Sequence, residues 1–255
     1  MLIILGNQLF APEYLAAAES KHVFMAEDRD LCTYVRHHQQ KLVLFLSAMR
    51  SYADEIENAG YQLTYHHLES PTGPTYEQRL KAVLNESGVT LFEHFEIEDK
   101  PFERRIAEFA ERNGFERRVL RSPMFTCSRK AFAEFAANKS RLLMADFYKQ
   151  QRRNLDVMVD ADLNPTGGQW SFDADNRKKL PRSVQPPEIT WSAPDAHSEN
   201  VMALVRREFS DHPGDAGEFR WPTTRSQARE WLDDFVMNRL HDFGPYEDAM
   251  STRSA

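Results

Sequence analysis

The fold of this chain is decided by its first nine residues, MLIILGNQL (residues 1–9). Four consecutive apolar residues, Leu2 to Leu5, end at Gly6. A short apolar run that stops at a turn residue is typical of a strand buried on both faces. Four further segments of this kind are predicted to be strands, at residues 22–26, 61–67, 90–97 and 117–121.

Helical patterns fill the intervals between these strands. Apolar residues recur at three- and four-residue spacings from Leu42 to Ile56, which predicts a long amphipathic helix that stops at Gly60. Two shorter helices are predicted at residues 76–87 and 101–113. Strands that alternate with helices over short connections are typical of an α/β fold. We therefore predict a doubly wound, five-stranded parallel (Rossmann-like) sheet with helices on both faces.

The character of the chain changes beyond residue 121. Helices are predicted at residues 128–137, 142–159, 197–209 and 224–242, the last of them stopped by Gly244, and residues 160–196 read as a long irregular connection. We expect three parts: an α/β domain over residues 1–125, helices and a linker over 126–196, and the start of an all-helical domain over 197–255. Because the last helices have apolar faces and few elements to cover them, we expect the chain to be the N-terminal part of a longer protein.

The composition sets limits on location and partners. The 255 residues carry a formal net charge of −7 and are 41% hydrophobic. No apolar run approaches the roughly 20 residues of a membrane span, and the N-terminus lacks a basic flank and a cleavage site, so we predict a cytoplasmic protein without membrane contact. Contact with phosphates would come from two local basic segments, from Lys149 to Arg153 and from Arg177 to Arg182; the alternative is a solvated, salt-bridged surface.

Ligands of doubly wound sheets bind beyond the carboxyl ends of the strands, where the strand order reverses. Three groups of polar residues fall at such ends: Gly6, Asn7 and Gln8 after the first strand, Glu27, Asp28 and Asp30 after the second, and Glu96 with Glu98 at the fourth. The acidic group lies where such folds place a ribose-binding carboxylate, with a solvated acidic loop as the alternative. A three-glycine dinucleotide fingerprint and a phosphate-binding Walker sequence are both absent.

The sequence offers no set of catalytic residues. The only cysteines, Cys32 and Cys127, have no evident base and are too few for a cluster that needs four thiolates. Adjacent histidines at residues 37–38 and 66–67 diverge on either a helix or a strand, so neither pair chelates as a unit and no metal site is predicted. The loop NPTGGQWSFDADNRKKLP (residues 164–181) combines aromatic and charged side chains. This composition favours a loop that binds another surface over a plain linker.

Four segments together resemble one protein family. They are LIILGNQL (residues 2–9), CTYVRHHQQKLVLFLSAMR (32–50), FYKQQRRNLDVMV (147–159) and GGQWSFDADNRKKLP (167–181). They are similar, in order and across nearly the whole chain, to bacterial cryptochrome/photolyase-related proteins, in the branch that carries an iron–sulfur cluster and includes (6-4) photolyases. The most specific parts are SAMR and the GGxWxFDxxNR pattern.

The resemblance implies a chromophore-binding antenna half of a light-dependent DNA photolyase or cryptochrome-like flavoprotein. In this family an N-terminal α/β domain binds a ribityllumazine, and a helical C-terminal half holds FAD, a [4Fe–4S] cluster and the damaged DNA. The segments Lys149 to Arg153 and Arg177 to Arg182 would then contact that half or phosphates. The pocket residues it implies are Gly6, Asn7 and Gln8, with the stretch from Asp30 to Tyr34 that includes Leu31 and Cys32. A stand-alone small-ligand module and a light-signalling cryptochrome fragment are the alternatives.

Overall fold

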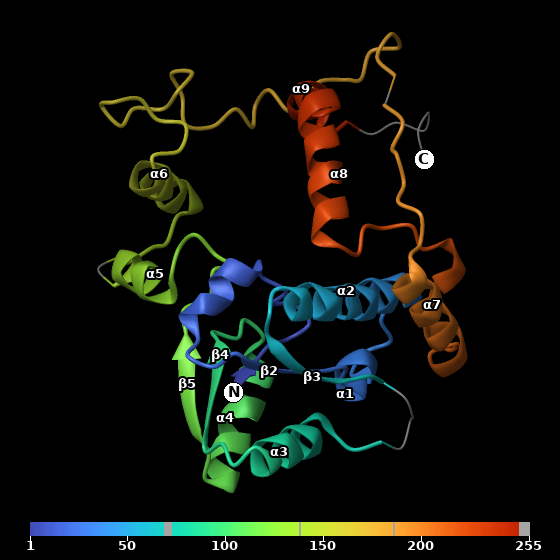
Figure 1. Cartoon of the computed structure of the whole chain (residues 1–255). Coiled ribbons are helices and arrows are strands. Elements are labelled where there is room, and N and C mark those ends of the chain that lie inside the picture. Colours follow the sequence, from blue (N-terminus) through green and yellow to red (C-terminus); the bar gives the residue numbers. More distant parts are fainter. Residues whose placement is uncertain (69–72, 138, 186, 250–255) are drawn as a thin grey trace. The chain divides into compact units, whose positions relative to one another are not determined.

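The computed structural model describes residues 1–68, 73–137, 139–185 and 187–249 (Figure 1). The chain forms two compact units. The first consists of residues 1–124 and 191–228, and the second of residues 125–190 and 229–255. The three-part division expected from the sequence stays a prediction, although the helix expected at 197–209 belongs to the first unit. Within the described residues, no helix is both long and apolar enough to cross a bilayer.

The first unit is built on a five-stranded parallel sheet, as predicted. Its strands are β1 (Leu2–Ile3), β2 (His22–Ala26), β3 (Gln62–His66), β4 (Leu91–Phe95) and β5 (Glu116–Leu120). The strand order is β3-β2-β1-β4-β5, and every neighbouring pair is parallel. The chain builds outward from β1 to β3, then crosses to the other side of β1 for β4, so the order reverses between β1 and β4.

Helices cover both faces of this sheet (Figure 1). One face is covered by α3 (Tyr76–Glu86) and α4 (Lys100–Asn113) and the other by α2 (Gln39–Asn58). The unit also contains α1 (Arg29–Thr33), α7 (Ala196–Glu208) and two 3-10 turns, η1 (Pro12–Ala17) and η2 (Ala216–Glu218). Side chains alternate along each strand, so Ile3 and Phe24 pack with α3 and α4, whereas Leu2 and Val23 pack with α2. The outer face of α2 packs on α7, and this buries α2 on two sides.

The bounds predicted from the sequence for these elements agree closely with the structure, but one helix was missed. Strand β2 has the predicted bounds, β1, β3 and β4 are shorter than predicted by two or three residues, and β5 has the predicted length but begins one residue earlier. The short helix α1 was not predicted. It begins after Asp28, whose carboxylate accepts the backbone N–H of Asp30 and so caps the helix.

The second unit contains helices and a long irregular segment. Its helices are α5 (Arg129–Ala136), α6 (Met144–Leu155), most of α8 (Arg225–Asn238) and α9 (Leu240–Tyr246). Apart from an isolated bridge between Val159 and Pro165, the described residues between α6 and α7 form no regular element, as expected for 160–196. The helix expected over 142–159 is shorter than predicted and ends at Leu155, where Asp156 takes a left-handed conformation. The prediction of one helix over 224–242, stopped by Gly244, is wrong. The helix breaks at Arg239, whose guanidinium turns back to Asp234, and α9 then includes Gly244.

Candidate functional site

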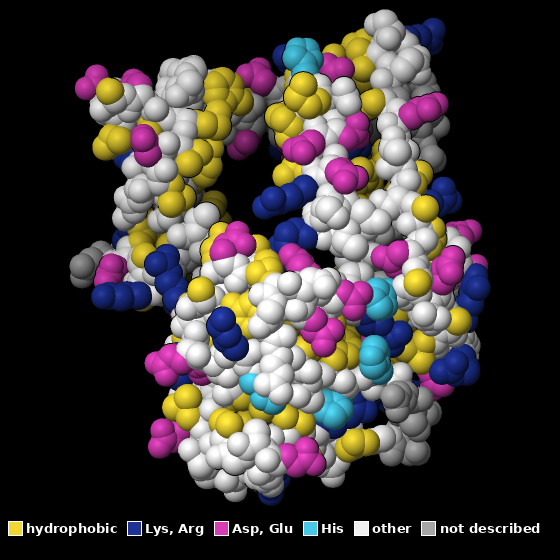
Figure 2. Space-filling view, in the orientation of Figure 1, with side chains coloured by type: hydrophobic (Ala, Val, Ile, Leu, Met, Phe, Trp, Pro, Cys, Tyr) yellow, Lys and Arg dark blue, Asp and Glu magenta, His cyan; other side chains and the backbone are white. Residues whose placement is uncertain are grey.

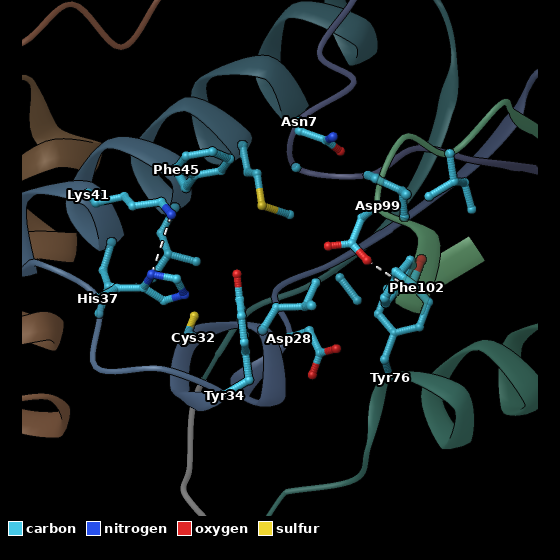
Figure 3. A pocket seen from close by; sticks show the side chains of 18 residues that line it. Asn7, Asp28, Cys32, Tyr34, His37, Lys41, Phe45, Tyr76, Asp99 and Phe102 are labelled. Atoms are coloured by element: carbon cyan, nitrogen blue, oxygen red, sulfur yellow. Dashed lines mark hydrogen bonds between the residues drawn. The ribbon is translucent and has the colours of Figure 1, made fainter. Parts of the chain in front are cut away.

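A cavity of about 260 Å³ opens in the first unit at the carboxyl ends of β1, β2 and β4 (Figure 3). This is the place where the strand order reverses, and the loops that follow the strands diverge there and leave room for a ligand. Most of its lining is apolar. The apolar side chains are Leu5, Ala26, Leu31, Leu42, Phe45, Leu46, Met49, Ile97 and Phe102.

The turn after β1 forms one wall of this pocket. Gly6 and Asn7 line it, and a Cβ atom on Gly6 would come within 2.7 Å of the Met49 sulfur, so a larger residue here would require the flexible Met49 side chain to move. Gln8 does not line the pocket. It is fully buried and donates hydrogen bonds to the Glu96 carbonyl at 2.7 Å and the Glu98 carboxylate at 3.2 Å. Gln8 therefore ties the loop after β1 to the loop after β4.

Glu27 also lies outside the pocket lining, although the sequence placed it among the ligand-binding residues. Its side chain is fully buried and accepts two hydrogen bonds from Arg50, at 2.7 and 3.0 Å. The Tyr65 hydroxyl and the backbone N–H of Leu68 bond to the same carboxylate. With four donors on two oxygens, Glu27 joins α2 to the ends of β2 and β3 and has little capacity left for a ligand.

Asp28 does line the pocket, but both of its oxygens already have partners. One caps α1 and the other forms an ion pair with Arg105 at 2.9 Å. Burial raises the pKa of Asp28, and the charge of Arg105 opposes that rise. Asp30 is exposed, does not line the pocket, and lies 3.6 Å from the same guanidinium.

Leu31, Cys32 and Tyr34, the remaining predicted residues, all line the pocket. The Tyr34 hydroxyl points into the cavity, and its ring meets that of His37 edge-on at 4.9 Å between centroids (Figure 3). Cys32 is buried. Burial, with smaller contributions from the charges of Asp28 and Glu27, raises the pKa of its thiol to about 12. A thiol with this pKa is protonated near neutral pH and is a poor nucleophile.

The Cys32 thiol should therefore resist modification in the folded chain. In a Cys127→Ser variant, which keeps Cys32 as the only cysteine, we expect a thiol reagent at pH 8 to react at least about a hundredfold more slowly than in urea. Colorimetric titration of released thiolate measures both rates. Equal rates with and without urea would contradict the burial of this side chain.

Several pocket residues were not predicted as ligand contacts. His37 lies just before α2, and Lys41 and Phe45 lie in its first two turns. Tyr76 belongs to α3, Asp99 caps α4 and Phe102 belongs to α4. The apolar pattern from Leu42 to Ile56 indicated a helix that faces the core. It gave no sign that this helix also lines a cavity. One signal was available: Asp99 precedes Pro101 at a helix start, directly after a strand at the predicted binding edge.

The second unit has a wider cavity of about 910 Å³, lined in part by Lys149, Arg152, Trp170 and Lys178. Arg152 is buried, donates to the carbonyls of residues 157, 158 and 170, and stacks on the Trp170 ring together with Arg153. The predicted basic segment thus turns part of its charge inward to hold the loop.

On the face of the first unit seen in Figure 2, basic and acidic side chains are mixed around α2 to α4, without a broad basic patch there.

Comparisons with known proteins identify a family and two relatives of this chain. A sequence model of the family described as deoxyribodipyrimidine photo-lyase-related protein matches residues 2–221. A (6-4) photolyase of Agrobacterium fabrum is 28% identical over 255 residues, which cover 98% of this chain and 50% of the photolyase. An uncharacterized protein of Acanthamoeba polyphaga mimivirus is 24% identical over 192 residues, 71% of this chain and 95% of that protein. The chain thus spans about half the length of the photolyase.

Proposed function

Because the chain belongs to the family of deoxyribodipyrimidine photo-lyase-related proteins, we propose that its first unit holds a light-absorbing antenna chromophore in the cavity between β1, β2, β4 and α2. The chain would be the N-terminal, antenna-binding half of a photolyase- or cryptochrome-like flavoprotein. The observation that carries this proposal is the apolar cavity at the point where the strand order reverses, in a chain of this family.

The size and lining of the cavity support a small ring system. Pockets for drug-sized ligands range over about 300–1,000 Å³, and the cavity, at about 260 Å³, is near the lower limit. A bicyclic ring such as that of ribityllumazine suits this volume better than a dinucleotide does. Phe45, Leu31 and Met49 offer flat or flexible apolar surfaces to such a ring.

The residues of the pocket suit binding rather than chemistry. Asp28 is held by Arg105, Cys32 is a protonated thiol, and no serine or cysteine of the pocket is paired with a base. Absorbed energy would pass to a flavin, which together with a [4Fe–4S] cluster and the damaged DNA would belong to a further half of the protein. Two cysteines cannot supply the four thiolates of such a cluster, so this chain alone would not hold it.

A second candidate is a stand-alone small-ligand module without photochemistry. One observation favours it: the mimivirus protein is matched over 95% of its own length, so a relative exists that is little longer than the matched region. The pocket would be the same and only the output would differ. A light-signalling role, as in cryptochromes, also uses the same pocket.

Co-elution with two ligands separates these readings. The purified chain is incubated with equimolar ribityllumazine and FAD and passed over a gel-filtration column, and the absorption spectrum of the protein peak is recorded. We expect ribityllumazine at one equivalent and no FAD. A peak that carries FAD, or one that carries neither compound, would overturn the proposal, and the second outcome would favour a module for a different ligand.

A further inference from the structure

The polar groups of the pocket are separated by charge. Lys41 and His37 lie on one side of the cavity, and Asp99 lies on the opposite side, with Asn7 close to that side (Figure 3). The apolar side chains fill the space between them. A ligand that spans the cavity therefore meets a basic end and an acidic end.

The basic end carries a single positive charge. The Lys41 ammonium lies 3.3 Å from Nδ1 of His37 and 5.9 Å from the centre of the Phe45 ring, and no carboxylate in the described part of the chain pairs with it. Burial, followed by the charge of Lys41, lowers the pKa of His37, so this ring is neutral near pH 7 and accepts from the ammonium. Lys41 keeps further N–H donors for an acceptor in the pocket.

The acidic end depends on Asp99. One of its oxygens accepts the backbone N–H of Phe102 at 2.8 Å and caps α4, and the other points into the cavity (Figure 3). Arg105 already pairs with Asp28, so Asp99 is the pocket carboxylate with an oxygen that no described residue binds. The amide of Asn7 is exposed beside it. This end therefore suits hydroxyl groups, which donate hydrogen bonds to a carboxylate.

We infer that Lys41 and Asp99 fix the orientation of the proposed ligand. Its planar ring presents carbonyl or ring-nitrogen acceptors to Lys41, and its hydroxyl-bearing arm reaches Asp99 and Asn7. This inference rests on the proposed function, because it states which part of the ligand lies at each end of the same pocket. Apolar walls alone would admit such a ring in either direction, and the charge separation selects one of them.

Two substitutions test the orientation and leave the fold intact. In Asp99→Asn the amide oxygen still caps α4, since Asn and Asp are equivalent at this position. In Lys41→Met the apolar stem is kept, and a cation is lost from the first turn of α2, where the helix dipole disfavours positive charge. Thermal melts of both variants should match the unsubstituted chain.

The test uses ribityllumazine and a lumazine in which a methyl group replaces the polyol arm, each titrated by fluorescence. We expect Asp99→Asn to weaken ribityllumazine binding about tenfold and to change binding of the armless ring less than about twofold. Lys41→Met should weaken both ligands by about the same factor, roughly tenfold.

The outcomes separate the orientation from the antenna proposal itself. Equal weakening of both ligands by Asp99→Asn, or no effect of Lys41→Met, would overturn the orientation while leaving the pocket as the binding site. If the unsubstituted chain binds neither ligand, the proposed function fails, and the assignment of ends fails with it.

Discussion

Replacement of Glu27 by glutamine is expected to lower the free energy of unfolding by about 3–5 kcal/mol. The substitution keeps the shape of the side chain and removes its charge, so the guanidinium of Arg50, only 11% exposed, is left without its counter-ion. The Tyr65 hydroxyl and the Leu68 N–H also lose a charged acceptor. A loss of this size is a large fraction of the roughly 5–15 kcal/mol that stabilises a typical domain. Urea denaturation, extrapolated linearly to water, measures it.

The matched control is Glu108→Gln. Glu108 pairs with Arg112 on the surface of α4, where both side chains are well exposed, and its loss should cost less than about 1 kcal/mol. A double variant, Glu27→Leu with Arg50→Met, should be more stable than Glu27→Gln, because no buried charge is left unpaired. Equal losses of unfolding free energy for Glu27→Gln and Glu108→Gln would show that the buried Glu27–Arg50 pair stabilises the fold no more than a surface pair does.

Replacement of Leu31 by tryptophan is expected to weaken ribityllumazine binding by about 10- to 100-fold. Leu31 lines the cavity yet is 41% exposed, so the larger ring fits at the pocket entrance without crowding the core. It competes with the chromophore for a cavity of only about 260 Å³, and overfilling a packed site costs about 1–3 kcal/mol. A fluorescence titration gives the dissociation constant.

Leu232→Trp serves as the control for this substitution. Leu232 is an exposed leucine of α8, outside the cavity lining, so the same change in side chain should leave binding unaltered. If Leu31→Trp and the unsubstituted chain bind the chromophore equally, the pocket is not where it sits. If both tryptophan variants weaken binding equally, the effect is not specific to the pocket.

The sheet could be predicted from the sequence because its signals are local. The run from Leu2 to Leu5 and four similar runs, each followed by turn or helix signals, identify a doubly wound fold without long-range information. The short helix α1 could not be predicted in this way. It depends on Asp28, which is held in place by Arg105 of α4, far along the chain.

The pocket was predicted in part, for the same reason. Gly6, Asn7 and Asp28 follow strands directly, and strand ends meet at one edge of a parallel sheet. Lys41 and Phe45 come from a helix whose apolar pattern indicated only core packing, so their position in the cavity needed the packing of α2. Glu27 looked like a ligand carboxylate because its partners Arg50 and Tyr65 lie on other elements.

The measurement that tests the central claim most directly is a crystal structure of this chain with ribityllumazine bound. We predict electron density for the ring in the cavity between β1, β2, β4 and α2, with acceptors toward Lys41 and the polyol arm toward Asp99. Density for the ring elsewhere, for example beside Trp170 in the cavity of the second unit, would contradict the account.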